Sequence, residues 1–289
     1  MSAGLQTAIL LSVASALSYA AAAVAQEQLA AAGHRSVPRW LLMLLLTGAG
    51  AGLHVIALSF GTVGVVQALG ALTLLFALPI AALRTRARVT PAAWRDAALT
   101  VAGLAGLLAL TVAPAAPSTL TDIQGRCLSM TTVVGVALLA CAARLSSSAT
   151  ARSLLYAVAS GTAFGVSSVL VKTQTAGLPA IAWPALITIA VLAAGGLLLG
   201  QLSYRGAGLA APLAAVSVTN PVVAATVGVL LLGEGFRFGT TGVVLAVLAG
   251  ALAARGVVGL AARSVTAKPA PSTPPVTAPR QAALTSPTV

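Results

Sequence analysis

The stretch Leu154–Lys172, LLYAVASGTAFGVSSVLVK, is an apolar helix with a small-residue face and one cation at its end. An earlier stretch, SVASALSYAAAAVAQE, resembles it, because Val13-Ala14-Ser15 stands 145 positions before Val158-Ala159-Ser160. The same register pairs Tyr19 with Phe164, Val24 with Val169 and Glu27 with Lys172. The two stretches predict that the chain is one membrane unit used twice.

The composition supports a membrane environment. Hydrophobic residues make up 58% of the 289-residue chain and charged residues 7%, whereas soluble domains carry about 25% charged residues. Such a chain cannot cover a water-facing surface, so we expect all-α spans in a lipid bilayer. The net charge of +12 does not indicate a nucleic-acid partner, because the basic residues stand singly in short loops without an aromatic-basic face.

Nine apolar runs are separated by polar or Pro/Gly breaks, and most reach the roughly 17–25 residues that cross a bilayer. The predicted spans are 4–27, 39–58, 62–83, 94–112, 127–143, 152–172, 182–203, 207–232 and 239–260. Cys127 and Cys141 lie about 21 Å apart along the fifth span, which is too far for a disulfide. Because no basic residue precedes Arg35, we interpret the first run as a retained span rather than a signal peptide.

The basic residues predict the orientation of the spans. With nine spans, 13 of the 16 Lys and Arg residues fall on one side and three, Arg126, Lys172 and Arg237, on the other. Basic loops stay in the cytoplasm, which predicts an external N-terminus and a cytoplasmic C-terminus. Breaking the run 207–232 at Asn220-Pro221 would give ten spans, but it would place the tail and Arg237 on the wrong sides.

This topology divides the chain into four parts. Residues 1–112 form a first repeat of four helices, 113–151 a linker with the fifth helix, and 152–260 a second four-helix repeat. The odd linker helix turns the second repeat upside down, which is a recurring architecture of secondary transporters. Residues 261–289 form a Pro/Thr-rich cytoplasmic tail that we expect to be disordered.

The eighth span contains the strongest candidate for a binding site. Pro221 removes a backbone donor and leaves the Ser217 carbonyl without its helical partner. Asn220 lies about 20 Å along the span, near the middle of the membrane, with the Thr219 hydroxyl beside it. A polar, kinked helix at this depth suits a substrate site. The alternative is a packing kink whose polar groups bond to neighbouring helices.

Other polar residues extend the candidate site. His54 and Gln67 flank the hairpin at 59–61 and could face each other near the outer surface, either as a gate or as an interhelical hydrogen bond. His54 could also titrate near neutral pH. Tyr19 and Ser167 place hydroxyls near mid-helix in the two repeats, although such hydroxyls often bond to their own helix.

Small residues and charges predict further contacts. We expect close helix packing at three glycine pairs, Gly48/Gly52, Gly161/Gly165 and Gly196/Gly200. Glu27 and Lys172 should lie at opposite membrane surfaces, and Glu27, which opposes its helix dipole, is the candidate ion-coupling residue. We interpret Asp96 and Asp122 as loop or helix-start residues.

The eighth and ninth spans resemble a known family. Asn220-Pro221, then Val229–Glu234, and then Gly242 and Gly250 resemble the C-terminal half of EamA-type permeases of the drug/metabolite transporter superfamily. The helix ending in Val171-Lys172 looks like the helix that opens that half. In the first half Val65–Gly70 occupies the matching place, with Ala68 where Pro221 stands. The resemblance covers most of residues 1–260.

The resemblance implies a carrier of inverted repeats for small metabolites. Members of the family usually have ten spans, and a nine-span chain is also similar to NIPA-type magnesium transporters. The leading hypothesis is therefore a secondary transporter with alternating access and a small-molecule substrate. The alternatives are a Mg²⁺ transporter, which the scarcity of carboxylates disfavours, and a non-transporting membrane scaffold.

The remaining expectations follow from what the sequence lacks and from its composition. No nucleophile–base set, metal cluster or phosphate loop is evident in the sequence, so we expect neither an enzyme nor a cofactor or metal site. Abundant Ala, Gly and Arg with scarce Lys indicates a high-GC bacterium, and hence the plasma membrane. The sequence leaves the oligomeric state open between a monomer and a homodimer.

Overall fold

The computed structural model describes residues 3–32, 36–58, 60, 66, 69–86, 88–112, 120–176 and 183–266. Nine α-helices lie within these residues, and eight of them are long and apolar enough to cross a membrane. They are α1 Ala3–Ala32, α2 Val37–Leu58, α4 Thr73–Thr85, α5 Pro91–Leu110, α6 Asp122–Leu145, α7 Ala149–Ala176, α8 Trp183–Ser203, α9 Ala210–Leu231 and α10 Gly239–Thr266. The predicted all-α polytopic membrane bundle is confirmed.

Local sequence signals set several of the helix ends. Thr90 caps α5 by accepting a hydrogen bond from the Ala93 amide, with Pro91 in the first helical position. A capping box of Thr121 and Gln124 starts α6, so this helix is longer than the predicted 127–143. The prediction that Thr111 and Val112 continue the fourth span is wrong, because they form strand β1, Thr111–Val112, which pairs antiparallel with β2, Gly235–Phe236.

Two predicted segments differ from the structure. The described part of the third span, 62–83, contains α4, whose 13 residues measure about 20 Å and cannot cross a bilayer alone. A turn at Ala71–Leu72 precedes this helix. Residues 261–266, which were expected to belong to the tail, are part of α10, and 267–289 lie outside the described residues.

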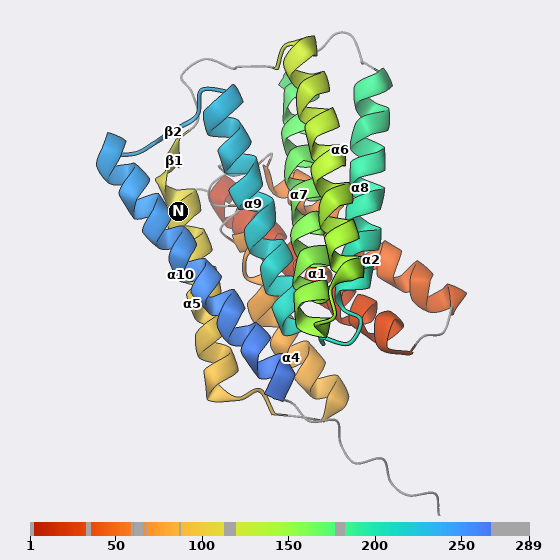
Figure 1. The fold of residues 1–289 in the computed structure, drawn as a ribbon. Helices are drawn as coiled ribbons and strands as arrows, with labels where there is room; N and C mark the ends of the chain where they lie inside the picture. The colour runs from red at the N-terminus through yellow and green to blue at the C-terminus, as the bar shows by residue number, and fades with distance from the viewer. Residues whose placement is uncertain are drawn as a thin grey trace, which may run out of the picture.

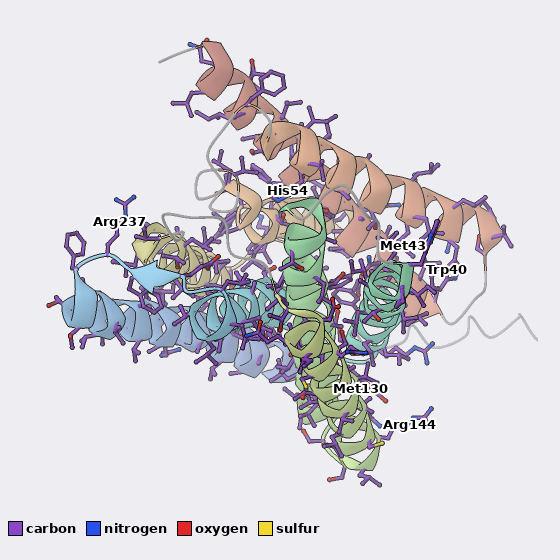
Figure 2. The ribbon with its side chains drawn as sticks, turned by 90° about the horizontal axis from the view of Figure 1, so that it is seen from above. Trp40, Met43, His54, Met130, Arg144 and Arg237 are labelled. Carbon is purple, nitrogen blue, oxygen red and sulfur yellow. The ribbon has the colours of Figure 1, made fainter. Side chains whose placement is uncertain are left out.

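The helices form groups that meet at the centre of the molecule. In Figure 1, α6, α7 and α8 stand side by side, α5 and α10 form a slanted pair, and α1 and α2 cross behind them. Seen from above, the pairs radiate from a shared centre, with His54 near the centre and Arg144 and Arg237 on two outlying arms (Figure 2). The centre is therefore bordered by helices from both predicted repeats.

The pairs α1–α2 and α7–α8 are built alike. The Ser15 hydroxyl donates to the Gly50 carbonyl, and the Ser160 hydroxyl donates to the Gly196 carbonyl, both at 2.7 Å. One helical turn after each serine, an aromatic ring covers the same glycine. These rings are Tyr19 over Gly50 and Phe164 over Gly196. The serines and the aromatic residues follow the 145-residue register found in the sequence, whereas the two glycines are 146 positions apart.

The two pairs run in opposite directions. The Gln201 side chain donates to the Gln26 carbonyl (2.7 Å), so the C-terminal part of α8 lies beside the C-terminal part of α1. The Ser153 hydroxyl donates to the Ser203 carbonyl (2.6 Å), so the same part of α8 lies beside the start of α7. The end of α1 and the start of α7 therefore share one end of the bundle, as inverted repeats require.

Three serines of α7 bond successively to α8. Besides Ser153 and Ser160, Ser167 donates to the Ile189 carbonyl at 3.5 Å. The donors are spaced by seven residues, and so are the acceptors in the opposite direction, which is the repeat of antiparallel helices with a heptad seam. We call these bonds the serine ladder. The Gly196/Gly200 contact predicted for this seam is confirmed, because both glycines face α7 side chains.

The predicted role of Gly48 and Gly52 is wrong. A Cβ at either position would meet nothing within 4 Å in the described structure, whereas one at Gly50 would meet the Tyr19 ring. Gly48 and Gly52 lie on the outward face of α2, and Gly50, which stands between them in the sequence, contacts α1. The Gly161/Gly165 contact is confirmed, since both pack against α9 around Thr219 and Asn220.

Helices α5 and α10 join the two halves along their length. A Cβ at Gly103 would lie 2.5 Å from the Ala249 carbonyl oxygen and 2.5 Å from the Ala253 nitrogen, so the backbones touch there. Nearer the start of α5, Gly259 of α10 faces the Asp96 carboxylate. At the other end, strands β1 and β2 connect the end of α5 to the start of α10.

The interpretation of Asp96 as a loop or helix-start residue is wrong. Its side chain is 0% exposed and accepts hydrogen bonds from Arg95 at 3.1 and 3.2 Å and from Arg263 of α10 at 2.9 Å. The two arginines keep part of their surface in solvent. Asp122, by contrast, lies exposed in the first turn of α6, as predicted.

Apolar packing differs between the two ends of the bundle. One cluster joins both halves, with Val24, Leu74 and Ala97 on one side and Leu213 and Leu260 on the other. It lies at the end where Asp96 meets Arg263, which we call the basic end. Arginines gather there at the end of α4, the start of α5, the α6–α7 and α8–α9 connections and the end of α10.

A second cluster lies toward the opposite end of the bundle. It contains Val166, Leu170, Leu192 and Val227 of α7, α8 and α9, with α6 residues packed against it. All of these elements belong to the linker helix or the second half. Within the described residues, the large apolar cluster that joins the halves lies at the basic end, whereas α5 and α10 stay in contact along their length.

Candidate functional site

A cavity of about 450 Å³ lies between the two halves. From the first half its wall is formed by α1, α2, α5 and the start of α4 with the residues just before it, and from the second half by α7, α8 and α9. At the basic end it reaches Ala23, Tyr204 and Leu213 of the cluster that joins the halves. Its volume falls within the roughly 300–1,000 Å³ of small-molecule sites.

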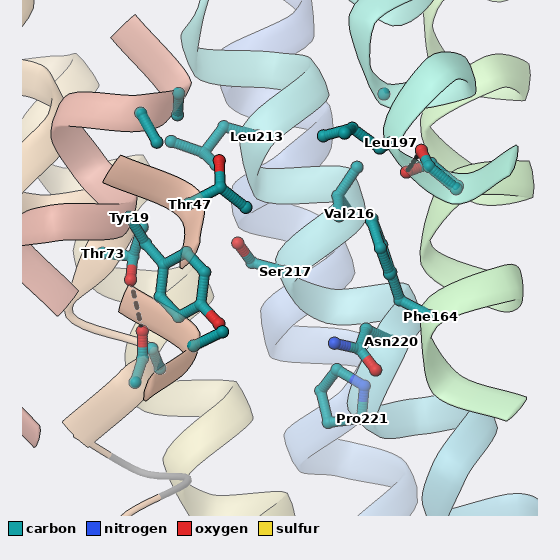
Figure 3. Close-up of a pocket in the computed structure, with 18 of the residues that line it drawn as sticks. Tyr19, Thr47, Thr73, Phe164, Leu197, Leu213, Val216, Ser217, Asn220 and Pro221 are labelled. Carbon is teal, nitrogen blue, oxygen red and sulfur yellow. Dashed lines mark hydrogen bonds between the residues drawn. The ribbon is translucent and has the colours of Figure 1, made fainter. Parts of the chain in front are cut away.

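Asn220 and Pro221 line this cavity from α9, as the sequence predicts (Figure 3). The helix continues from Ala210 to Leu231 through Pro221, although proline has no amide to offer the Ser217 carbonyl. The backbone around Asn220 rests on Gly161 and Gly165 of α7. This close packing fixes the back of α9, while the side chains of Ser217 and Asn220 face the cavity.

Tyr19 also lines the cavity, and the matched aromatic Phe164 lines it from the other half. In Figure 3, Tyr19 lies on one side, Phe164 on the other, and Ser217 and Asn220 lie between them. Each ring is held by the glycine beneath it. The cavity thus has an aromatic wall from each repeat, one with a hydroxyl and one without.

The polar groups of the cavity fall into two classes. Thr47, Thr73 and Ser160 donate to backbone carbonyls of Met43, Gly70 and Gly196, so their hydroxyl protons are committed (Figure 3 shows the bond from Thr73). A second group of lining side chains forms no hydrogen bond with a described residue. These are Tyr19, Gln26, His54, Tyr204, Ser217 and Asn220.

Two predicted site residues, Thr219 and Ser167, do not line the cavity. Thr219 packs toward Gly161 at the α7–α9 contact, because it lies on the opposite face of α9 from Ser217 and Asn220. Ser167 donates to the α8 backbone as part of the serine ladder. Gln67 lies outside the described residues. His54 does line the cavity, with Gly70 opposite its ring.

Glu27, the candidate ion-coupling residue, lies next to the cavity wall rather than in it. Its neighbour Gln26 lines the cavity at the basic end, and Glu27 itself is half-buried. Burial, and then the negative charge of Glu27, raise the pKa of the Tyr204 hydroxyl above its usual range. Tyr204 lines the cavity at the basic end, so the carboxylate of Glu27 acts electrostatically on a residue of that end.

Sequence reasoning missed several lining residues. Tyr204 follows α8 in a short turn, and Thr47 and Gln26 lie in runs without a recognisable motif. Phe164 carried a usable signal, because the internal register pairs it with Tyr19.

Formal charges are absent from the described lining of this cavity, which contains no Asp, Glu, Lys or Arg side chain. Within the described parts of the chain, no group of three or more His, Cys, Asp or Glu residues could hold a metal ion. The arrangement can bind a solute by hydrogen bonds and apolar contact.

Comparison of the chain with protein-family models, curated proteins and solved structures found no significant match.

Proposed function

We propose that this membrane protein is a secondary transporter of small molecules that works by alternating access. The observation that supports the proposal best is the cavity of about 450 Å³ between two inverted helix pairs, where six polar lining side chains form no hydrogen bond with a described residue. Sites between inverted repeats, near a helix interrupted by proline, are typical of such carriers. The resemblance to EamA-type permeases belongs to the same proposal.

The packing supports a mechanism. Apolar side chains from both halves close the cavity at the basic end, whereas the described apolar cluster at the other end lies within the second half and linker. We place the basic end on the cytoplasmic side of the plasma membrane and the N-terminus on the external side. This conformation then admits solute from the outside, and rocking of the halves opens the inner end.

Glu27 is the candidate for ion coupling. It is half-buried beside Gln26 and Tyr204 at the inner end of the cavity. Protonation of this carboxylate would remove a negative charge from the end that must open, which links proton binding to the exchange between the two states.

The alternative of a Mg²⁺ transporter is less well supported. Mg²⁺ sites use carboxylates and retained waters, and the described wall of the cavity provides no carboxylate.

Transport by purified protein in liposomes tests the proposal. Proteoliposomes and empty liposomes are exposed to a bacterial metabolite extract, and the trapped solutes are identified by mass spectrometry. We expect at least one solute to accumulate with wild-type protein, less with Asn220→Ala, and a normal amount with Ser168→Ala. Ser168 is a suitable control because its exposed hydroxyl bonds to its own helix. Equal contents in proteoliposomes and empty liposomes would contradict the proposal.

A further inference from the structure

The described wall of the cavity contains polar side chains that form no hydrogen bond with a described residue, and it contains no charged side chain. The uncommitted groups are hydroxyls, amides and one imidazole, all of which can be neutral at pH 7. Asn220 is the only asparagine in the chain, and its amide offers both donors and an acceptor. Most of the remaining wall is Ala, Gly, Leu and aromatic carbon.

Such a wall discriminates strongly by charge. An ion that leaves water for an apolar protein interior loses several kcal/mol of hydration unless an opposite charge meets it. No described residue of the wall supplies that charge, and Glu27 is not among the residues that line the cavity. A neutral solute loses only the hydration of its polar groups, and hydrogen bonds to the wall replace it.

We infer that the substrate is an uncharged small molecule that pairs an apolar ring or chain with hydrogen-bonding groups such as amides or hydroxyls. Tyr19 and Phe164 provide apolar surface on two sides, and the Asn220 amide and the Tyr19 hydroxyl bind the polar groups. The inference rests on the proposed function, since it names the substrate class of the same cavity. It makes Asn220 the specificity-determining residue.

Binding of matched probes tests this directly. The purified full-length protein in detergent is heated with benzamide, benzoate or benzylammonium, which share one ring, and with butyramide, butyrate or butylammonium, which share one chain. The shift of the unfolding midpoint with concentration gives an apparent Kd for each. We expect the amide of at least one set to bind at least about tenfold more tightly than both of its charged analogues.

Two variants assign the selectivity to the cavity. Asn220→Asp keeps the side-chain shape and adds a carboxylate, so binding should shift from the amide toward the ammonium probe. Tyr19→Phe keeps the ring over Gly50 and removes one hydroxyl, which should weaken amide binding without lowering the midpoint of the unliganded protein. Ser168→Ala should leave every probe unchanged.

Two results would overturn the inference. The first is a charged probe that binds as tightly as its amide in both sets, and the second is the absence of binding by either amide. Flux is measured separately, so the two proposals can fail independently. Transport of charged solutes alone would leave the carrier function and remove the substrate class, whereas amide binding without any flux would do the reverse.

Discussion

At the scale of single residues, Asp96 is the carboxylate most dependent on its surroundings. It is fully buried and accepts hydrogen bonds from Arg95 and Arg263, so it joins α5 to the last turns of α10. We expect Asp96→Asn to lower the free energy of unfolding by about 1–3 kcal/mol, because the three hydrogen bonds from the two arginines then no longer reach a charged acceptor. Denaturation in detergent, followed by tryptophan fluorescence, measures the loss.

The chain provides a matched control for this substitution. Asp122 is its only other aspartate and lies exposed at the start of α6, where its charge contributes at most about 1 kcal/mol through the helix dipole. Asp122→Asn should therefore have the smaller effect. An equal effect of the two substitutions would show that the buried contacts do not stabilise the fold.

We expect the stability of the protein to depend on alkaline pH through the hydroxyl of Tyr204. Burial and the charge of Glu27 raise the pKa of its hydroxyl in the folded protein above the unfolded value of about 10. The folded state therefore favours the neutral phenol, and the stabilisation is complete below about pH 10 and lost as the pH rises through the folded value. Stability measured above pH 10 should fall in the wild type and fall less in Tyr204→Phe. Identical pH profiles for the two proteins would refute this.

Sequence reasoning reached some of these residues and not others. Asn220 and Pro221 stand out in an apolar run, and the cavity contains both. Asp96 stands close to Pro91 in the sequence and therefore looked like a helix-start residue that faces water, but it lies in the second turn of α5, and its partner Arg263 is 167 positions away. No local pattern reports a contact over that distance.

At the scale of helices, close packing predicts opposite outcomes for two glycines. A methyl group at Gly103 would press on the α10 backbone at 2.5 Å, and overpacking of this kind costs about 1–3 kcal/mol. Gly103→Ala should therefore destabilise the protein and separate α5 from α10. Thermal unfolding in detergent provides the measurement.

Gly48→Ala is the control for that experiment. A Cβ at Gly48 meets nothing within 4 Å, and alanine favours a helix by up to about 1 kcal/mol over glycine. We therefore expect this variant to be as stable as the wild type or slightly more so. Destabilisation by Gly48→Ala would reveal a partner for the outer face of α2, such as a second copy of the chain.

The helical type and the positions of eight long helices could be read from hydropathy, because a bilayer demands apolar segments of set length, but the predicted span 62–83 contains only the short helix α4 in its described part. The ends required side-chain caps, and α6 begins earlier than its apolar run for that reason. Which glycines contact a neighbouring helix could not be predicted from the sequence. A GxxxG spacing shows that small residues share one face of a helix, but not which helix packs against that face. On α2 the contact falls on Gly50, between Gly48 and Gly52.

At the scale of the whole molecule, the two ends of the cavity should differ in accessibility. Leu108 lines it near the end of α5, and Leu213 lines it within the cluster that joins the halves. In a variant without Cys127 and Cys141, we expect Leu108→Cys to react with an impermeant maleimide added outside cells and Leu213→Cys to be protected. Reaction of Leu213→Cys with protection of Leu108→Cys would contradict the proposed open side.

The internal similarity at a spacing of 145 residues relates positions in the first half of the chain to positions in the second. It pairs Tyr19 with Phe164, and in the structure both rings lie on glycines and line the same cavity. The far side of that cavity, including Tyr204 and Thr47, could not be deduced, because it depends on how two helix pairs approach in space. Pairwise similarity along a chain does not encode that approach.

The serine ladder restricts how this protein can change shape. Sliding α7 along α8 by one residue would break the bonds from Ser153, Ser160 and Ser167 simultaneously, since all three share one spacing. We therefore expect α7 and α8 to move together as a rigid body. Bending is left to segments such as α9, where Pro221 already interrupts the amide ladder, so a chemical staple across α7 and α8 should leave turnover intact while one across α7 and α9 should stop it.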